Sequence, residues 1–427
     1  ASDRYARAAG ELDLLDPVSA EDVPTFDYRR NFQIAGVKHD RRDGDRNLSV
    51  VAAVVHDNLT GTLSTGGEQH QRTLSLSSRL DVSGSIGSMG GWSGGLVARS
   101  SVTDLVIEGA GVEALVVDRE APGLARGADV DVVVPKVEAA AYAQLRIPTA
   151  GPTFYPGVRV GVVTLPMRPM VEPRLAMRWK VADQTEVKAA VGYYAQAPTV
   201  LDAVEGVGDP NLGLTRSVQG SLGVEQTISG RLEIHLDSYH KELDDALLIR
   251  PGEVPDGGHR ARASGVEAVV RYRLRDRFFL WGWGGLARNR TLDGSVWRPN
   301  DYDQPVNLGL VASWDPNRKV NLAVRWRYGS GLPWTLVDDH VYDATHDTWL
   351  PVPGELNAQR MPAYTKLDLV VARRMTFDRW TLTLRAELWY VPRSSNVLYP
   401  TYNFDWSEQG WVRGIPFLPL LGARATF

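Results

Sequence analysis

Residues 380–390 read WTLTLRAELWY, and this stretch decides the fold that we expect for the chain. Apolar and polar side chains alternate with a period of two, as in a strand that has one apolar face. Ten steps of about 3.3 Å, tilted by about 40°, give a height of roughly 25 Å, the height of a membrane-facing apolar band. The apolar face has an aromatic residue at each end and consists of Trp380, Leu382, Leu384, Ala386, Leu388 and Tyr390.

The same alternation recurs at residues 231–237, 266–275 and 320–328, where the polar faces are rich in charges. Since a soluble β-sandwich also alternates, the pattern alone leaves a sandwich and a membrane barrel equally open. In a barrel, the charged faces would line the lumen. The lumen-facing charges that we expect are Arg271, Arg273, Arg325, Arg327, Arg385 and Glu387, and the expected aromatic girdle is Trp326, Tyr328, Trp380 and Tyr390.

The lengths of the connections favour the barrel. Short turns are expected near 183–184, 229–230, 276, 316–317 and 378. Longer stretches rich in Gly, Pro and Asp separate them, at about 197–214, 244–260, 289–303, 329–362 and 392–417. Alternating short and long connections are typical of outer-membrane barrels, whose periplasmic turns are short and whose external loops are long. The sequence therefore predicts an all-β, transmembrane, antiparallel up-and-down barrel whose last residue, Phe427, lies at the periplasmic side.

The first half alternates less regularly. The strands expected there are at about 26–40, 46–57, 70–83, 93–107, 111–118, 137–147, 157–165, 172–182 and 184–196. About 18 strands result, and bacterial single-chain barrels usually have an even number. We expect residues 26–427 to form the barrel, and residues 1–25 to form a loop or a partial strand.

Composition excludes several other classes. The 427 residues include no cysteine, so neither a disulfide framework nor a thiolate metal site is possible. The net charge of -4 gives no basic footprint for nucleic acid. No apolar run reaches the roughly 18 residues of a spanning helix, and a barrel needs none.

The region from about 137 to 427 resembles the C-terminal barrel of TonB-dependent outer-membrane receptors. Short strings in the family's order support the resemblance, and no single one is specific. They are Ala141-Tyr142-Ala143-Gln144-Leu145, Pro173-Arg174-Leu175-Ala176, Asp209-Pro210-Asn211-Leu212-Gly213, Pro362-Ala363-Tyr364-Thr365-Lys366-Leu367-Asp368-Leu369 and Gly422-Ala423-Arg424-Ala425-Thr426-Phe427. Leu214-Thr215 stands where the family usually has Pro-Glu, which suggests a divergent member.

The resemblance implies a barrel of 22 strands in the bacterial outer membrane and uptake of a scarce solute such as a metal chelate, a cofactor or a glycan. External loops would capture the solute, and a plug domain would couple to a TonB-type energy complex. We find no plug string here, so the sequence is expected to be either part of a longer chain or a reduced barrel. The alternative function is a plugless barrel that serves as a structural subunit or anchor of an outer-membrane assembly. We expect contact with outer-membrane lipid, no bound cofactor and no nucleic acid.

Three local patterns carry candidate chemistry. Residues 91–95 read GWSGG and match the nucleophile elbow, but no helix is expected after them, so a flexible loop is the favoured interpretation and no enzyme is predicted. A long loop carries Asp338, Asp339, His340 and His346, which could bind a metal or a metal chelate, although such loops are commonly just solvated.

The inward arginines could attract an anionic solute, but pairing with Glu267 and Glu387 is favoured. We interpret Trp281 and Trp283 as membrane-facing girdle or packing residues.

Overall fold

The computed structural model describes residues 2–6, 26–63, 68–87, 90–108, 129–250, 255–274, 277–344 and 348–427. Most of them belong to one 19-stranded sheet. Its strands are β1 (Ser2–Ala6), β2 (Phe26–Asp43), β3 (Arg46–Leu63), β4 (Glu68–Ile86), β5 (Gly90–Glu108), β6 (Val130–Pro148), β7 (Thr153–Thr164), β8 (Met167–Ala182), β9 (Thr185–Gln196), β10 (Thr215–Ile228), β11 (Leu232–Leu248), β12 (Asp256–Leu274), β13 (Phe278–Asp293), β14 (Val296–Pro299), β15 (Val306–Asn317), β16 (Val320–Gly329), β21 (Tyr364–Thr376), β22 (Thr381–Tyr390) and β25 (Phe417–Thr426).

Smaller elements lie in the connections between these strands. Three separate two-stranded sheets pair β17 (Pro333–Trp334) with β20 (Gln359–Arg360), β18 (Val337–Asp343) with β19 (Thr348–Pro353), and β23 (Val397–Tyr402) with β24 (Gln409–Arg413). Short 3₁₀ turns are η3 (Leu201–Ala203) and η5 (Arg393–Ser395). Within the described ranges, no helix is long and apolar enough to cross a membrane.

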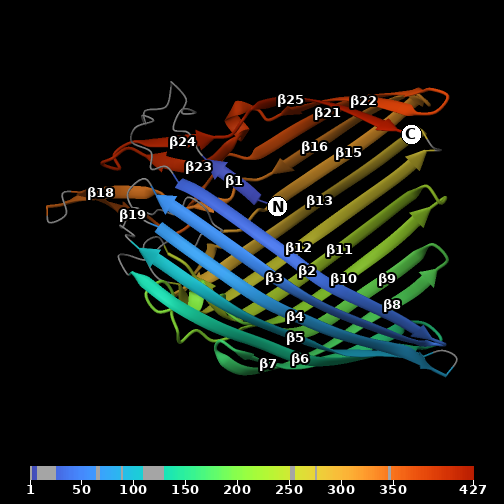
Figure 1. Cartoon of the computed structure of the whole chain (residues 1–427), viewed down its shortest axis with the longest axis horizontal. Coiled ribbons are helices and arrows are strands. Elements are labelled where there is room, and N and C mark those ends of the chain that lie inside the picture. The colour runs from blue at the N-terminus through green and yellow to red at the C-terminus, as the bar shows by residue number, and fades with distance from the viewer. Residues whose placement is uncertain are drawn as a thin grey trace.

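The main strands are antiparallel, and each pairs with its neighbours along the chain, which gives the predicted up-and-down barrel wall. The β18–β19 and β23–β24 hairpins gather at one end of this wall, and the C-terminus lies at the other, beside the short turns (Figure 1). The fold class expected from the sequence is therefore confirmed.

The two faces of the sheet differ sharply in burial. Leu105 of β5 and Asp368 of β21 are 0% and 1% exposed, whereas Val102 and Leu369 on the opposite faces of these strands are 45% and 44% exposed. Side chains converge on the concave side of a curved sheet and splay apart on the convex side, so the buried face is the inner one. The outer face carries most of the exposed large apolar residues, as a membrane-facing band requires.

Strand β25 closes the chain as the sequence analysis described. It pairs with β22 from Thr381↔Thr426 to Tyr390↔Phe417, which places Leu421 and Ala423 on the outer face together with Leu384. Leu421 is 89% exposed, and within the described residues β22 is the main-sheet strand that pairs with β25. The aromatic rings of Phe377, Trp380 and Phe427 stack in a row at the turn end, with centroids 4.5 and 6.2 Å apart.

Some boundaries differ from the predictions. Strands β11 and β12 run to Leu248 and from Asp256, so the loop expected at 244–260 is much shorter. Residues 91–95 belong to β5 and are followed by more strand, so the flexible loop predicted there is wrong. Ser93 pairs in register with Ser83 and Gln144 and cannot sit on a strand-to-helix elbow. The strand expected at 111–118 and the turn expected at 276 lie outside the described residues.

Candidate functional site

The inner face of β16, β21 and β22 carries a connected group of charges. Asp368, which is almost fully buried, lies 3.3 Å from the Nε atom of Arg325. The Arg325 guanidinium also lies 3.9 Å from Glu387, which in turn pairs with Arg385 at 2.6 Å. The cross-strand register brings these groups together, because Asp368 stands opposite Arg325 on one side and opposite Trp389 on the other. Two carboxylates thus neutralise two of the arginines expected in the lumen.

A lysine and a tryptophan extend the group. The Lys366 ammonium lies 3.3 Å from Asp368 and 3.8 Å from the centre of the Trp389 ring. The indole nitrogen of Trp389 donates a hydrogen bond of 2.6 Å to Glu387. A cation over an aromatic face is attracted by the electron-rich ring. The wall therefore presents a fixed surface that combines cations with an aromatic ring.

The arginines of β12 lie on the same inner face, with different partners from those expected. Arg271 pairs with Glu233 of β11 at 3.6 Å, although the sequence analysis favoured Glu267. Within the described part of the chain, no carboxylate lies within 4.0 Å of the guanidinium groups of Arg273 or Arg327. The inner wall therefore keeps positive charge that can attract an anionic solute.

Trp281 and Trp283 of β13 also face inward, so of their two expected roles the membrane-facing girdle is wrong and packing remains. They stand opposite Arg271 and Val269, and their ring centroids are 4.8 Å apart. A β-carbon at Gly309 would lie 1.9 Å from the Trp283 ring, so the missing side chain makes room for the indole. The sequence held a signal for this: Leu280 and Leu286 alternate with the tryptophans and belong to the outer face.

The girdle residues of the predictions lie on the outer face near the two ends of the wall. The rings of Trp326 and Tyr328 lie 6.3 Å apart, and Trp326 donates a hydrogen bond of 3.1 Å to Thr365. Trp380 lies in the aromatic row at the turn end, and Tyr390 is at the opposite end of β22. Their positions are those that interfacial aromatic residues occupy in membrane barrels.

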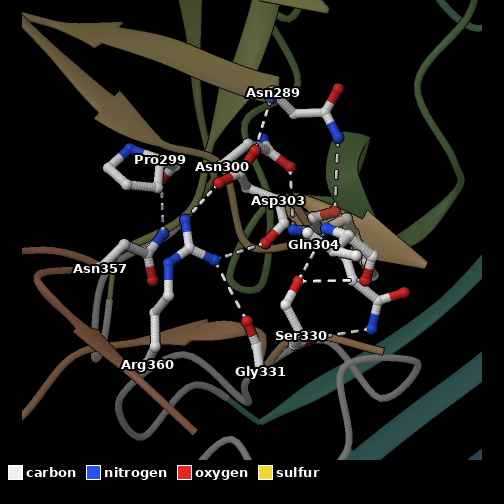
Figure 2. A network of polar contacts seen from close by, with 11 residues as sticks. Asn289, Pro299, Asn300, Asp303, Gln304, Ser330, Gly331, Asn357 and Arg360 are labelled. Atoms are coloured by element: carbon white, nitrogen blue, oxygen red, sulfur yellow. Dashed lines mark hydrogen bonds and ion pairs between the residues drawn. The ribbon is translucent and has the colours of Figure 1, made fainter. Parts of the chain in front are cut away.

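The longest connections are braced to one another by buried polar contacts (Figure 2). Asp303 is 3% exposed and accepts a hydrogen bond of 2.6 Å from the backbone of Asn289. The Arg360 guanidinium pairs with the Asp303 carboxylate and also donates to the Asp303 and Gly331 carbonyls at 2.8 and 3.1 Å. Arg360 belongs to β20, near one end of the 330–363 connection, and Gly331 lies near the other end. This one arginine therefore ties residues 300–305 to both ends of that connection.

A second brace comes from Asn357, a buried residue in the left-handed backbone region at φ 55°. Its amide nitrogen donates to the carbonyl of Pro299 at 3.1 Å and to Asp301 at 2.6 Å. Asparagine tolerates this backbone conformation better than most residues. Beside it, Gln304 donates to the carbonyl of Ser330 at 3.0 Å (Figure 2). These braces join the connections at the loop end of the wall to one another.

A cluster of ion pairs surrounds Asp293, the last residue of β13, at the loop end of the strand. Asp293 lies seven residues beyond Leu286, an exposed apolar residue of the outer face. Asp293 accepts hydrogen bonds from Arg250 at 2.9 Å and from Arg298 at 3.1 Å. The hydrogen bond from Arg250 is the main cause that lowers the pKa of the Asp293 carboxyl below its usual 3.8. Arg298 also pairs with Glu355 and so links this cluster to the 330–363 connection.

The loop residues proposed as ligands do not form a metal site in the described part of the chain. Asp338, Asp339 and His340 belong to β18, where His340 packs edge-on against Trp349 with centroids 5.1 Å apart. His346 lies outside the described residues. Within those residues, no group of three or more histidines, cysteines or acids is placed to hold a metal ion. A ligand role for this loop stays a prediction.

Aromatic residues join the two outermost hairpins instead. Trp406 donates a hydrogen bond of 3.1 Å to the carbonyl of Trp349, and Tyr402 accepts one of 3.1 Å from the backbone of Val337. The Tyr402 and Trp406 rings lie 5.5 Å apart, and burial raises the pKa of the Tyr402 hydroxyl. Neither these contacts nor the Asp303–Arg360 brace could be expected from the sequence, because the partners are 57 or 65 positions apart.

The connection from β9 to β10 packs against the loop ends of β5 and β6. Val204 and Val207 join Leu105, Ile107 and Val130 in one buried apolar cluster, all three strand residues being on the inner face. The Lys136 ammonium donates to the carbonyl of Pro198 at 3.1 Å. This segment therefore covers part of the inner wall at the loop end.

One family model matches most of the chain. Residues 4–387 match the family model described as TonB dependent receptor-like, beta-barrel. A search of curated proteins gave no match.

Several solved structures share the fold. The ferric yersiniabactin uptake receptor FyuA from Yersinia pestis is 13% identical, with a TM-score of 0.67 over 98% of this chain and 65% of its own. The pyoverdine receptor FpvA from Pseudomonas aeruginosa PAO1, bound to pyoverdine, is 13% identical, with a TM-score of 0.62 over 94% of this chain and 62% of its own. The ferric citrate transporter FecA, in its unliganded form, is also 13% identical, with a TM-score of 0.66 over 94% of this chain and 62% of its own. This chain thus spans less than two thirds of the length of each of these structures.

Proposed function

Since this chain belongs to the family of TonB-dependent receptor-like β-barrels, we propose that it forms the outer-membrane wall of a receptor that actively takes up a scarce solute. The observation that carries the proposal is the pairing of a braced external surface with a cationic and aromatic inner wall. A passive pore has no need for external loops that are fixed by buried ion pairs. A receptor that captures a dilute solute gains affinity when its binding surface is already ordered.

An anionic metal chelate is the solute class that the inner wall favours. Arg273 and Arg327 supply positive charge, and Trp281 and Trp283 supply flat apolar faces beside it. Two of the structures named above, FyuA and FecA, are a ferric yersiniabactin uptake receptor and a ferric citrate transporter, which supports the same class for this chain. A cofactor or a glycan fragment remains the alternative solute, since flat rings also stack on sugars.

Uptake against a gradient needs an energy source, which the outer membrane lacks. We propose that a plug domain inside the barrel and a TonB-type energy complex are the partners, as the family implies. The inner charges of β12 and β16 would then contact the plug in the resting state. The aromatic girdle and the outer apolar band would contact outer-membrane lipid.

The test is uptake by cells that express the full-length protein, with and without the energy complex. The probes are isotope-labelled ferric chelates of citrate, catecholate and hydroxamate type, labelled cobalamin and a labelled oligosaccharide. We expect a ferric chelate to be captured at the surface of both strains and to accumulate only in the strain that has the complex. Arg360→Gln should weaken capture by about tenfold, because it releases the loop brace. Arg168→Gln, at the exposed β7–β8 turn, should leave capture unchanged.

Equal accumulation in both strains would refute energised uptake. No difference between expressing and deletion cells for any probe would favour the alternative function, a structural barrel. In that case deletion should deplete another outer-membrane protein, which quantitative proteomics of the membrane fraction would show.

A further inference from the structure

Four consecutive short turns of the wall carry exposed cations. They are the β10–β11, β12–β13, β15–β16 and β21–β22 turns, and they lie at the end of the wall where the C-terminus is, opposite the hairpins (Figure 1). Asp378 is the acid among the described residues of these turns, and within those residues neither it nor the cations form an ion pair. We call these cations the cationic rim, which consists of Arg231, Arg277, Arg318, Lys319 and Arg379.

The turns of the cationic rim follow one another along the edge of the sheet. The Arg273 amide of β12 donates to the Arg231 carbonyl at 2.9 Å, and the Arg374 amide of β21 donates to the Lys319 carbonyl at 2.7 Å. Between these two contacts, β13 pairs with β15. Successive turns are thus two strands apart, which spaces their cations at intervals of roughly 10 Å.

Aromatic residues show where the membrane ends relative to the rim. Trp314, at the turn end of the outer face of β15, is 51% exposed, and Phe377, Trp380 and Phe427 stack in a row at the same end. Such residues at the edge of an apolar band mark the membrane–water interface. Arg318 lies in the turn beyond Trp314, so its side chain reaches the aqueous side of that interface.

The turns on the other side of the wall are different. Residues 87–89 and 149–152, at the β4–β5 and β6–β7 turns, include no lysine or arginine. At the β8–β9 turn Lys180 pairs with Asp183 at 3.8 Å, and at the β2–β3 turn Arg41 lies 3.9 Å from Asp43. Within the described part of the chain, a run of consecutive turns with unpaired cations is therefore confined to the rim.

We propose that the cationic rim binds the cell wall, a periplasmic polymer whose peptide branches carry carboxylates. A small anion can meet one turn at a time, whereas a polymer with carboxylates at intervals can meet several turns at once, and the attractions then reinforce one another. Because the rim lies beyond the aromatic residues, a polymer in water fits it better than a lipid head group does. The proposal rests on the proposed outer-membrane location, with the turns in the periplasm, and does not depend on solute uptake.

Co-sedimentation of the full-length protein in detergent with purified cell-wall sacculi tests the proposal. The probes are untreated sacculi, sacculi whose carboxylates have been amidated, and phosphatidylglycerol in mixed micelles as a competitor. We expect the wild type to bind untreated sacculi at least about tenfold more tightly than the rim variant, and added salt to weaken the binding of the wild type. The rim variant is Arg277→Gln, Arg318→Gln, Lys319→Gln, Arg379→Gln.

A control variant removes the same number of exposed cations from turns outside the rim and should bind as the wild type does. It consists of Lys38→Gln, Arg41→Gln, Arg168→Gln and Lys180→Gln. Amidation of the sacculi should abolish the difference between the wild type and the rim variant.

Folding of each variant is checked by its heat-dependent shift on a detergent gel. If the rim variant does not fold, Arg318→Gln with Lys319→Gln provides the reading, and about threefold weaker binding is expected. These two substitutions leave the turn intact, because its backbone amides donate to the Asn317 side chain at 2.9 and 3.1 Å.

Equal binding of untreated sacculi by the wild type and the rim variant would overturn the proposal. Equal binding of amidated and untreated sacculi by the wild type would overturn it as well, since carboxylates would then not be recognised. Phosphatidylglycerol that displaces the sacculi at similar concentrations of anionic groups would also overturn it, because the rim would then be a lipid site.

Discussion

Two parts of the barrel wall differ in the length of their strands and in what extends them at the loop end. Strands β2–β6 have 18 or 19 residues each, whereas β15, β16, β21 and β22 have 10 to 13. At about 3.3 Å per residue, the first set is far taller than a membrane band of about 25 Å. The second set is close to the band in height and carries the braced loops and hairpins instead.

The inner faces of the two parts also differ, in the kinds of side chain that they carry. The inner row of β4 and β5 includes Thr73, Ser75, Ser77, Ser101 and Thr103, which are small hydroxyl residues. The inner rows of β16, β21 and β22 carry arginine, lysine, carboxylates and tryptophan in contact. The tall wall also has side-chain pairs, such as Asp81 with Arg79 and Tyr142, but the carboxylates of the short wall are more deeply buried. Single substitutions should therefore affect the short wall more.

The largest effect is expected at Asp368. Asp368→Ala leaves Arg325 and Lys366 without their carboxylate in a buried position, and should lower the free energy of unfolding by about 2–3 kcal/mol. In the tall wall, Asp81 accepts hydrogen bonds from Arg79 at 2.7 Å and from the Tyr142 hydroxyl, but its side chain is 30% exposed against 2% for Asp368, so Asp81→Ala should cost less than about 1 kcal/mol. Urea titration of the barrel in lipid vesicles, followed by gel mobility, measures both. Equal losses would remove the distinction between the two walls.

Removal of the loop brace should act locally. Arg360→Gln breaks the contacts that hold Asp303 and Gly331, so backbone amides of residues 330–363 should exchange hydrogen about ten- to thirtyfold faster. Exchange in β21 and β22 should stay unchanged. Arg168→Gln is the matched control, because its guanidinium bonds to the carbonyl of its own neighbour Met167 at 3.3 Å. Unchanged exchange in the Arg360 variant would show that the loops are held by other contacts.

A methyl group added to a glycine of the inner face should affect stability differently in the two walls. Gly309→Ala places a β-carbon 1.9 Å from the Trp283 ring, which must move, and should cost about 1 kcal/mol or slightly more. Gly91→Ala in β5 meets its nearest atom at 3.5 Å, an ordinary contact, and should change stability by less than about 0.5 kcal/mol. The urea titration measures the change, and near-ultraviolet circular dichroism reports whether the tryptophan pair moves. A neutral Gly309 variant with an unchanged spectrum would contradict the packing described.

The smallest expected effect is on how the stability of the loop end changes with acidic pH. Arg250 and Arg298 lower the pKa of Asp293 in the folded state below the 3.8 of an unpaired carboxyl. The stability that this pairing gives is therefore fully present above pH 3.8 and is lost as the pH falls through the lowered pKa. Cleavage of the 330–363 connection by pepsin should rise as the pH falls through this window. The Asp293→Asn variant should be cleaved at the same rate throughout this pH window. If cleavage of the wild type also did not change with pH, the proposed link between Asp293 protonation and stability would be refuted.

Much of the wall could be predicted from the sequence, because the membrane imposes one rule on every strand. The alternation around Leu382 and Leu384 reports which face meets lipid, and it needs no knowledge of neighbours. The same alternation indicates that Trp281 faces inward. The girdle was nevertheless considered for this residue, because tryptophan is common at membrane interfaces. The Asp303–Arg360 brace was not predictable, since it depends on how two loops fold back on each other and neither residue stands in a periodic pattern.

Cysteine labelling in intact cells tests most directly the central claim, that this is a membrane barrel with its long loops outside and its short turns inside. The chain has no cysteine, so a single introduced thiol is unambiguous. Glu408→Cys lies in the turn between β23 and β24, and Asp183→Cys lies in the β8–β9 turn. With a membrane-impermeant maleimide, we predict labelling at position 408 in intact cells and at position 183 only after the outer membrane is opened. Labelling of both positions in intact cells, or of position 183 alone, would contradict the account.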